Sequence, residues 1–326
     1  MVENELQGLP WIRTLMADWQ LIADAAFSDL VLWVPKRTKL HVYAHARPST
    51  AATLFYRDIT GTAARTDWRK AIDEAWETGK PVLASEVSEY SGTASRLSAY
   101  PVFEPKKTSK SKPVAVITRH TNLGESRYPN KLQLNFVACA EQLLEMVSAG
   151  EFPIPDAGTD SRRGAPRVTD GLIRLDKSGR VLFASPNALS MFNRSGLEGE
   201  LEGRLFSDSV KGLSPHSGIV DEGLPLVLTG KGAWKTDIEF DSMVLSVRSI
   251  PITASGERSG AAILCRDVTE LRVRERELLT KDLTIREIHH RVKNNLQTVA
   301  SLLRIQSRQS KSEEVKDSLA QAMRRV

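Results

Sequence analysis

The spacing of apolar residues in the first 150 positions predicts helices that alternate with short strands. Residues 11–26 carry apolar side chains three or four positions apart, as on one face of a helix: Trp11, Leu15, Trp19, Ile22 and Ala26. Runs of β-forming residues bounded by charges, proline or glycine predict strands. The expected strands cover 28–35, 40–46, 98–105 and 112–122, and two further helices cover 68–78 and 130–147.

A second segment of mixed helices and strands follows a polar connection. Residues 150–167 contain proline, glycine, aspartate and arginine with little apolar content, which predicts a linker. Residues 168–270 then predict a strand, a turn at 177–179, a second strand and a helix that begins near Pro186. Three more strands are expected at 235–240, 243–252 and 260–267, and the last of them leads into a charged helix.

The chain beyond Val268 has the pattern of a coiled coil. No proline or glycine interrupts it as far as Gln309, and apolar residues recur at intervals of seven: Leu271, Leu278, Ile285, Val292 and Val299. Further apolar residues widen this stripe: Ile288, Leu296 and Leu303. The pattern predicts one continuous helix that pairs with its copy in a homodimer.

A second helix is expected to pack back on the first. Ser310 or Ser312 can cap it, and acidic residues stand in its first turn. Its apolar stripe is Val315, Leu319, Met323 and Val326. Two such hairpins in a dimer would form a four-helix bundle.

The polar side of the long helix carries the candidate chemistry. At about 100° per residue, His290 projects away from the apolar stripe, whereas His289 lies at its border. Asn294 lies one turn after His290 on this outer face, Gln297 two turns after it, and Glu287 one turn before. An exposed histidine among polar residues, opposite a dimer seam, has the geometry that a phosphoacceptor needs.

Composition excludes several classes of protein. The chain is 41% hydrophobic and 26% charged, and no apolar run approaches the ~18 residues of a membrane span. The N-terminus lacks the pattern of a secretory signal. Two cysteines in apolar surroundings, Cys139 and Cys265, are expected to be buried and reduced, in a cytoplasmic protein without membrane contact. The net charge of +5 is spread along the chain, so we expect no direct contact with nucleic acid.

Three segments resemble known families. The element order of the first segment is similar to that of GAF domains. The run DGLIRLDKSGRVLFASPNAL, together with Asp267-Val268-Thr269-Glu270, resembles PAS domains, in which this Asp and Thr couple the last strand to the outgoing helix. The run EIHHRVKNNLQTVASLLR, residues 287–304, closely resembles the dimerisation and phosphotransfer helix of the HWE-related sensor histidine kinases.

These resemblances imply an α+β fold with four parts. They are a GAF-like sensor domain at 1–149, a linker at 150–167, a PAS domain at 168–270, and an incomplete coiled-coil and phosphotransfer segment at 271–326. The family's phosphoacceptor is the histidine before arginine, here His290 followed by Arg291, with Asn294 as the matching polar residue. Arg291 stands where commoner kinases carry an acid, and Glu287 is a candidate for that acid by helical geometry.

The expected function is that of a sensor histidine kinase in a two-component system. His290 would accept the γ-phosphoryl group of ATP and pass it to an aspartate of a response regulator. No segment resembles an ATP site, because Gly230-Lys231-Gly232 is most simply a turn. We therefore expect ATP and Mg²⁺ to be bound by a catalytic domain that follows in the family, and this chain alone to be inactive.

Two other readings remain open. A non-enzymatic GAF/PAS ligand-sensing dimer that docks a partner protein fits everything except the His290 face, and a nucleic-acid binder would show affinity that falls steeply with salt. The sensed ligand is unknown. His216 lies in a loop-like context that suits a haem ligand poorly, and His41, His45 and His120 are more typical of structural histidines than of a metal site.

Overall fold

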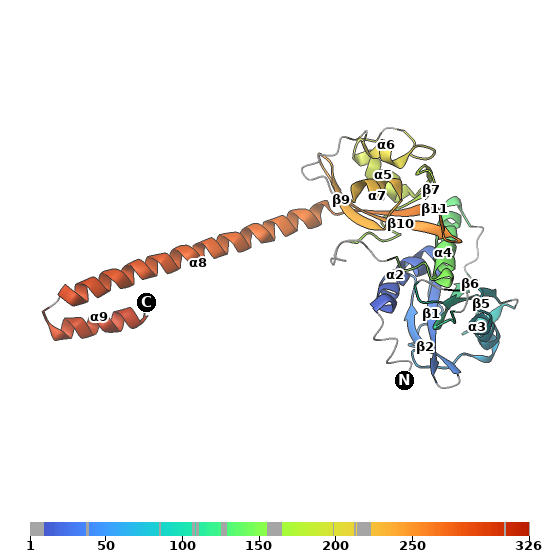
Figure 1. Cartoon of the computed structure of the whole chain (residues 1–326), viewed down its shortest axis with the longest axis horizontal. Coiled ribbons are helices and arrows are strands. Elements are labelled where there is room, and N and C mark those ends of the chain that lie inside the picture. The colour runs from blue at the N-terminus through green and yellow to red at the C-terminus, as the bar shows by residue number, and fades with distance from the viewer. Residues whose placement is uncertain are drawn as a thin grey trace. The chain divides into compact units, whose positions relative to one another are not determined.

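The computed structural model describes residues 10–36, 39–84, 86–105, 108, 111–124, 129–154, 165–197, 199–211, 213, 223–309 and 311–325 (Figure 1). The chain divides into two compact units, Met1–Val268 and Thr269–Val326. Most of the basic loop between the strands at 98–105 and 112–122 lies outside the described residues, as do His216, Ser310 and Val326.

The N-terminal part of the first unit is built on an antiparallel sheet of order β2-β1-β6-β5-β3, with β4 also paired to β5. The strands are β1 (Ser28–Lys36), β2 (Lys39–Ala46), β3 (Val82–Leu83), β4 (Ser88–Tyr90), β5 (Thr93–Val102) and β6 (Ala115–Asn122). The helices are α2 (Pro10–Ala26), α3 (Thr66–Thr78) and α4 (Lys131–Ala149). Every helix and strand predicted for this segment is present, and β3 and β4 were not predicted.

Alternation along β1 explains why this sheet has two buried faces. Leu30 and Leu32 belong to the core that includes α2 and α4, whereas Val31 and Trp33 belong to the core that includes α3. Because successive side chains of a strand point to opposite faces, an unbroken apolar run is the expected pattern for a strand covered on both sides.

Local signals end and begin the helices at the predicted places. Gly79 adopts φ +64° and donates its N–H to the Ala75 carbonyl at 3.1 Å, which closes α3. Asn130 and Gln133 form a reciprocal capping box at the start of α4. Gly150 ends α4 at φ +72°.

The second part of the first unit contains a sheet of order β8-β7-β11-β10-β9. The strands are β7 (Leu172–Asp176), β8 (Val181–Ala184), β9 (Trp234–Glu239), β10 (Val244–Ala254) and β11 (Glu257–Asp267), and the helices are α5 (Pro186–Arg194), α6 (Phe206–Lys211) and α7 (Leu224–Thr229). One face of this sheet packs against these helices through a core that includes Ile173, Val247 and Ile263. The helix predicted near Pro186 and all five strands are confirmed.

The other face of this sheet packs on the helices of the first part. Leu172, Ile250 and Leu264 share one hydrophobic cluster with residues of α2 and α4. Phe152 is 3% exposed and belongs to the same cluster, although it lies in the stretch predicted as a linker. Residues 155–164 of that stretch lie outside the described part of the chain.

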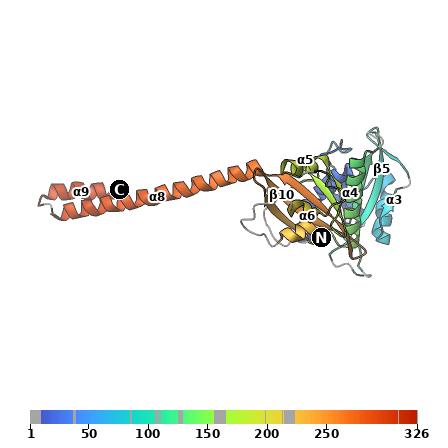
Figure 2. The same ribbon diagram turned by 90° about the horizontal axis from the view of Figure 1, so that it is seen from above.

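The second unit is a helical hairpin. α8 (Thr269–Gln309) is one helix of 41 residues, and α9 (Glu313–Arg325) packs alongside its C-terminal part, as Figures 1 and 2 show. The Ser312 carbonyl accepts the Lys316 amide at 3.2 Å, so α9 begins directly after this serine. The predicted continuous helix and its hairpin are both present.

Candidate functional site

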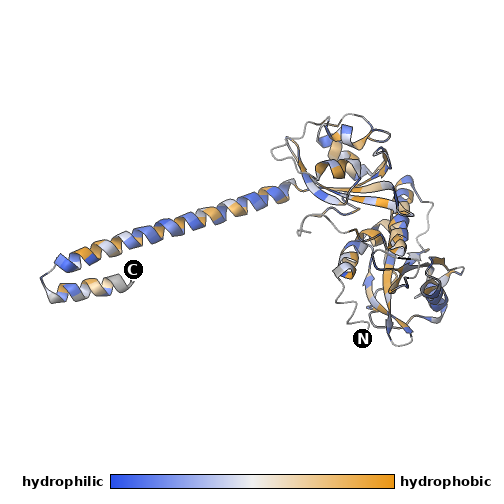
Figure 3. Cartoon of the chain, in the orientation of Figure 1, coloured by the Kyte–Doolittle hydropathy of each residue, from blue (hydrophilic) through white to orange (hydrophobic). Residues whose placement is uncertain are grey.

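An exposed apolar stripe follows one side of α8. In the single chain none of the described side chains of α8 is buried, and hydrophobic residues recur among hydrophilic ones along its length (Figure 3). The heptad residues Leu278, Ile285 and Val292 are 62%, 52% and 47% exposed. Such a seam on a charged helix is typical of a surface that a partner helix covers in a coiled coil.

His290 lies on the side of α8 opposite this stripe. It stands two residues from both Ile288 and Val292, which places it about 160° around the helix from each. His289 stands one residue from Ile288 and three from Val292, about 100° and 60° away. Both histidines are exposed in the single chain. Their positions relative to the stripe therefore distinguish them, and only His290 stays far from a helix that covers the seam.

The predicted site residues around His290 form one ion pair. The Arg291 Nε donates to the Glu287 Oε1 at 2.7 Å, one turn apart on the exposed surface. Glu287, the candidate for the catalytic acid, is thus bound to Arg291, the residue that stands directly after His290. Asn294 lies one turn after His290, and its carbonyl accepts the Thr298 hydroxyl at 3.0 Å.

Asp267 and Thr269 stand where β11 passes into α8. Asp267 is the last residue of β11 and Thr269 the first of α8, and the Val268 amide between them donates to the Val244 carbonyl at 2.9 Å. Asp267 also pairs with Arg194 of α5 at 3.2 Å. Nothing in the local sequence signals Arg194 as its partner, because the two are far apart along the chain.

Two of the three histidines in the N-terminal part meet in one buried cluster. His45 Nε2 lies 3.1 Å from Asp29 Oδ1, and His120 Nε2 lies 2.8 Å from the Thr118 hydroxyl. Both rings contact Phe55 edge-on, with centroids 5.0 Å apart in each case. His41 does not join them and instead contacts the Lys39 carbonyl.

Burial sets the charge of His120 in this cluster. Desolvation lowers the pKa of His120 to about 3, even though nearby Asp29 acts in the opposite direction, so the ring is neutral. Among the residues that the structure describes, no group of three or more His, Cys, Asp or Glu side chains could hold a metal ion.

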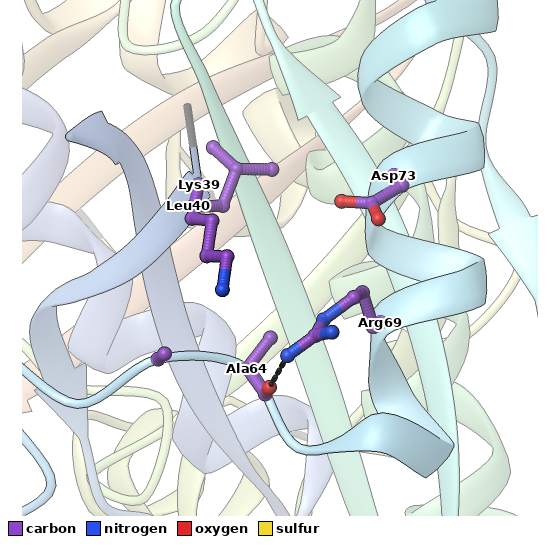
Figure 4. A pocket seen from close by; sticks show the side chains of 6 residues that line it. Lys39, Leu40, Ala64, Arg69 and Asp73 are labelled. Atoms are coloured by element: carbon purple, nitrogen blue, oxygen red, sulfur yellow. Dashed lines mark hydrogen bonds between the residues drawn. The ribbon is translucent and has the colours of Figure 1, made fainter. Parts of the chain in front are cut away.

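A small pocket opens between the start of β2 and α3 (Figure 4). Lys39, Leu40, Ala64, Arg69 and Asp73 line about 220 Å³, and Arg69 donates to the Ala64 carbonyl at 3.1 Å. Pockets for drug-sized ligands usually measure about 300–1,000 Å³. We therefore assign no ligand to this pocket.

Both cysteines are free and buried, as predicted. Burial raises the pKa of Cys139 to about 11, and it also raises the pKa of Cys265. A thiol that stays protonated is a poor nucleophile and a poor metal ligand. These residues fill the cores and carry none of the candidate chemistry.

Models of known families match three consecutive parts of the chain. Residues 7–140 match the GAF domain of the histidine kinase PdtaS, residues 166–273 match the PAS fold, and residues 287–326 match a histidine kinase model. The last match begins at Glu287 and includes the predicted phosphoacceptor helix from that residue onward.

Two curated relatives match over nearly the whole chain. The sensor histidine kinase PdtaS of Mycolicibacterium smegmatis is 38% identical over 97% of this chain and 63% of its own length. PdtaS of Mycobacterium tuberculosis is 37% identical over 97% of this chain and 64% of its own length. The chain thus spans less than two thirds of the relatives that it matches.

A solved structure described as the sensor region of a sensor histidine kinase has a similar fold. It superposes with a TM-score of 0.66 and 30% identity, and covers 83% of this chain and 99% of its own. Within the described residues, no helix is both long and apolar enough to cross a membrane.

Proposed function

The chain belongs to the sensor histidine kinases with GAF and PAS domains, and we propose that His290 of α8 accepts a phosphoryl group from ATP and passes it to a response-regulator aspartate. The observation that carries the proposal is the position of His290. It is exposed, it is surrounded by polar residues, and it lies opposite the apolar stripe of a helix that matches the histidine kinase model.

The proposed reaction moves one phosphoryl group twice. An imidazole nitrogen of His290 forms a bond to the γ-phosphorus of ATP, the bond to the β,γ-bridging oxygen breaks, ADP leaves, and the imidazole proton passes to solvent. The carboxylate of the regulator's aspartate then displaces the histidine nitrogen. Mg²⁺ bound to ATP would neutralise phosphate charge during the first step.

The dimer seam and the phosphoacceptor use opposite sides of α8. A second copy packed on Ile288 and Val292 would cover the apolar stripe and leave His290 open to an ATP-binding domain and then to a regulator. We propose a homodimer for this reason, with the four helices of two α8–α9 hairpins forming the bundle. The reaction would take place in the cytoplasm, which supplies ATP.

Asp267, Thr269 and Asn294 have different proposed roles. Asp267 and Thr269 would couple the PAS sheet to α8, because Asp267 binds Arg194 at the end of the strand that continues into this helix. Asn294 would contribute a polar group one turn from His290. Glu287 and Arg291 bind one another, so we propose that they act as a pair rather than as a separate base and cation.

A phosphorylation assay tests the assignment of His290. The whole chain is mixed with a separately supplied histidine kinase ATP-binding domain, Mg²⁺ and γ-labelled ATP, and acid-labile label is measured on the chain. We expect label on the wild type, no label on His290→Gln, and undiminished label on His289→Gln. The matched pair changes adjacent histidines of the same helix.

Two outcomes would contradict the proposal. Label that survives His290→Gln would move the acceptor elsewhere, and equal loss in both variants would show that the histidines are needed only for the helix. A dimeric chain that never accepts label would favour the non-enzymatic GAF/PAS sensor that docks a partner protein.

A further inference from the structure

Two cationic side chains stand before and after His290 along the axis of α8, on the same flank of the helix. Arg286 precedes it by four residues and Lys293 follows it by three, so they lie about 40° and 60° from His290 around the helix. Along the axis they stand about 6 Å before it and 4.5 Å after it, one turn to each side. Both side chains are exposed.

Neither of these two cations is paired within the described part of the chain, although Asp282 stands one turn before Arg286. Residues 286–294 contain three cationic side chains and one acidic side chain, Glu287, which pairs with Arg291 at 2.7 Å. Among the residues that the structure describes, neither Arg286 nor Lys293 forms an ion pair. The charge on the two residues that flank His290 is thus available to an incoming anion.

We propose that Arg286 and Lys293 form a clamp that holds the phosphoryl oxygens at His290 during transfer. This inference rests on the proposed function, because it requires His290 to be the acceptor. A phosphoryl group presents several anionic oxygens, and charge-assisted hydrogen bonds from arginine and lysine are the usual way to position it. Cations on both sides would neutralise the charge that the group brings to the imidazole.

Arg291 is not a member of this clamp. It lies about 100° around the helix from His290, and the Glu287 carboxylate holds its guanidinium. An exposed ion pair of this kind is worth about 0–1 kcal/mol, and in the structure it directs the guanidinium toward Glu287. Around the helix Arg286 lies about 160° from Ile288 and Lys293 about 140°. A second α8 centred on Ile288 and Val292 would therefore leave the ends of both side chains open to solvent.

Phosphoramidate offers a test that needs no ATP-binding domain. The His290 nitrogen forms the new bond to phosphorus, the nitrogen–phosphorus bond of phosphoramidate breaks, and ammonia leaves with the imidazole proton. The initial rate of phosphorylation of His290 is measured by mass spectrometry of peptides, because phosphoramidate can also react with the exposed His289. We expect Arg286→Gln and Lys293→Gln each to lower the rate about fivefold, the effect of one charge at ~4 Å in water.

Matched variants distinguish the effect of a charge beside His290 from that of a charge elsewhere on α8. Arg304→Gln removes the same charge from an exposed residue on the same side of α8, about 21 Å away, and should leave the rate unchanged. Arg286→Lys and Lys293→Arg, which keep the charge, should retain most of the wild-type rate. A purely structural role would not predict this. High salt should shrink the difference between wild type and variants.

The experiments distinguish a wrong clamp proposal from a wrong assignment of the phosphoacceptor. Rates at His290 for Arg286→Gln and Lys293→Gln equal to that of Arg304→Gln, with label from ATP still lost in His290→Gln, would overturn the clamp and leave the acceptor in place. Label transferred from ATP to His290→Gln in the assay described above would overturn both.

Discussion

At the scale of single residues, burial decides which histidines can carry charge. His120 is 1% exposed, its Nε2 contacts the Thr118 hydroxyl at 2.8 Å, and desolvation lowers its pKa to about 3. His290 is exposed on a helix and keeps access to solvent and to partners. The same residue type thus serves as packing in one place and as a candidate phosphoacceptor in the other.

The low pKa of His120 makes stability depend on pH. The folded chain keeps this ring neutral, whereas the unfolded chain binds a proton below about pH 6.5, so acid favours unfolding. The contribution of His120 is fully present above pH 6.5 and is lost as the pH falls toward 3. Relative to His120→Gln, the wild type should lose up to about 1.4 kcal/mol of unfolding free energy per pH unit in that window.

Urea denaturation at several pH values between 7.5 and 5 measures this slope. His41→Gln is the matched control, because it removes a histidine of the same part that lies outside the buried cluster. It should keep the wild-type slope. Parallel slopes for the wild type and His120→Gln would show that the ring is not held neutral.

At the scale of elements, β11 is the strand on which the PAS-like sheet and α8 both depend. It lies between β7 and β10 and continues through Val268 into α8. Gly260 pairs with Asp176 of β7 and with Ile252 of β10, and a side-chain carbon there would lie 2.3 Å from the Leu175 carbonyl oxygen. Backbone approaches too closely for any other residue.

Gly260→Ala should therefore destabilise the chain. The added methyl group must push β7 and β11 apart, and overpacking of this kind costs about 1–3 kcal/mol. Thermal unfolding followed by circular dichroism gives the change. Gly124→Ala, in an exposed turn where the nearest atom is a side-chain oxygen at 3.2 Å, should have little effect. Equal shifts in the two variants would contradict the explanation.

At the scale of the whole molecule, the GAF-like and PAS-like parts of the first unit share a buried ion pair. Arg248 of β10 donates both terminal nitrogens to the Asp18 carboxylate of α2, at 2.9 and 2.7 Å. The two side chains are only 12% and 9% exposed. Removal of one partner would leave the other charge buried and unpaired, which is costly. This ion pair should therefore stabilise the contact between the two parts.

A double-mutant cycle measures how strongly the two parts are coupled here. Asp18→Asn and Arg248→Gln should each lower the free energy of unfolding by about 3 kcal/mol, and the double variant should lose much less than their sum. The pair Lys131–Glu202 joins the same two parts at 2.8 Å but is 69% and 35% exposed, so its own cycle should give under about 1 kcal/mol. Additive losses at Asp18 and Arg248 would contradict the coupling.

The sequence alone determined most of the helices and strands, though not the short β3, β4, α6 and α7, and it singled out the candidate site residue. Helices and strands follow from the period of apolar residues, as in α2 and β11, and these signals are local. The positions of His290, Ile288 and Val292 around α8 also follow from spacing, because a regular helix converts spacing directly into angle.

Only the tertiary structure decided which distant residues meet. Asp18 with Arg248, and Asp267 with Arg194, are pairs that no local pattern links. The burial of Phe152 within a polar stretch depends on where the second sheet packs.

The pairing of Glu287 with Arg291 was within reach of the i,i+4 rule, but which of its possible partners Glu287 binds depends on side-chain geometry. Contacts across a fold depend on packing of whole elements, and that information is not contained in any single segment.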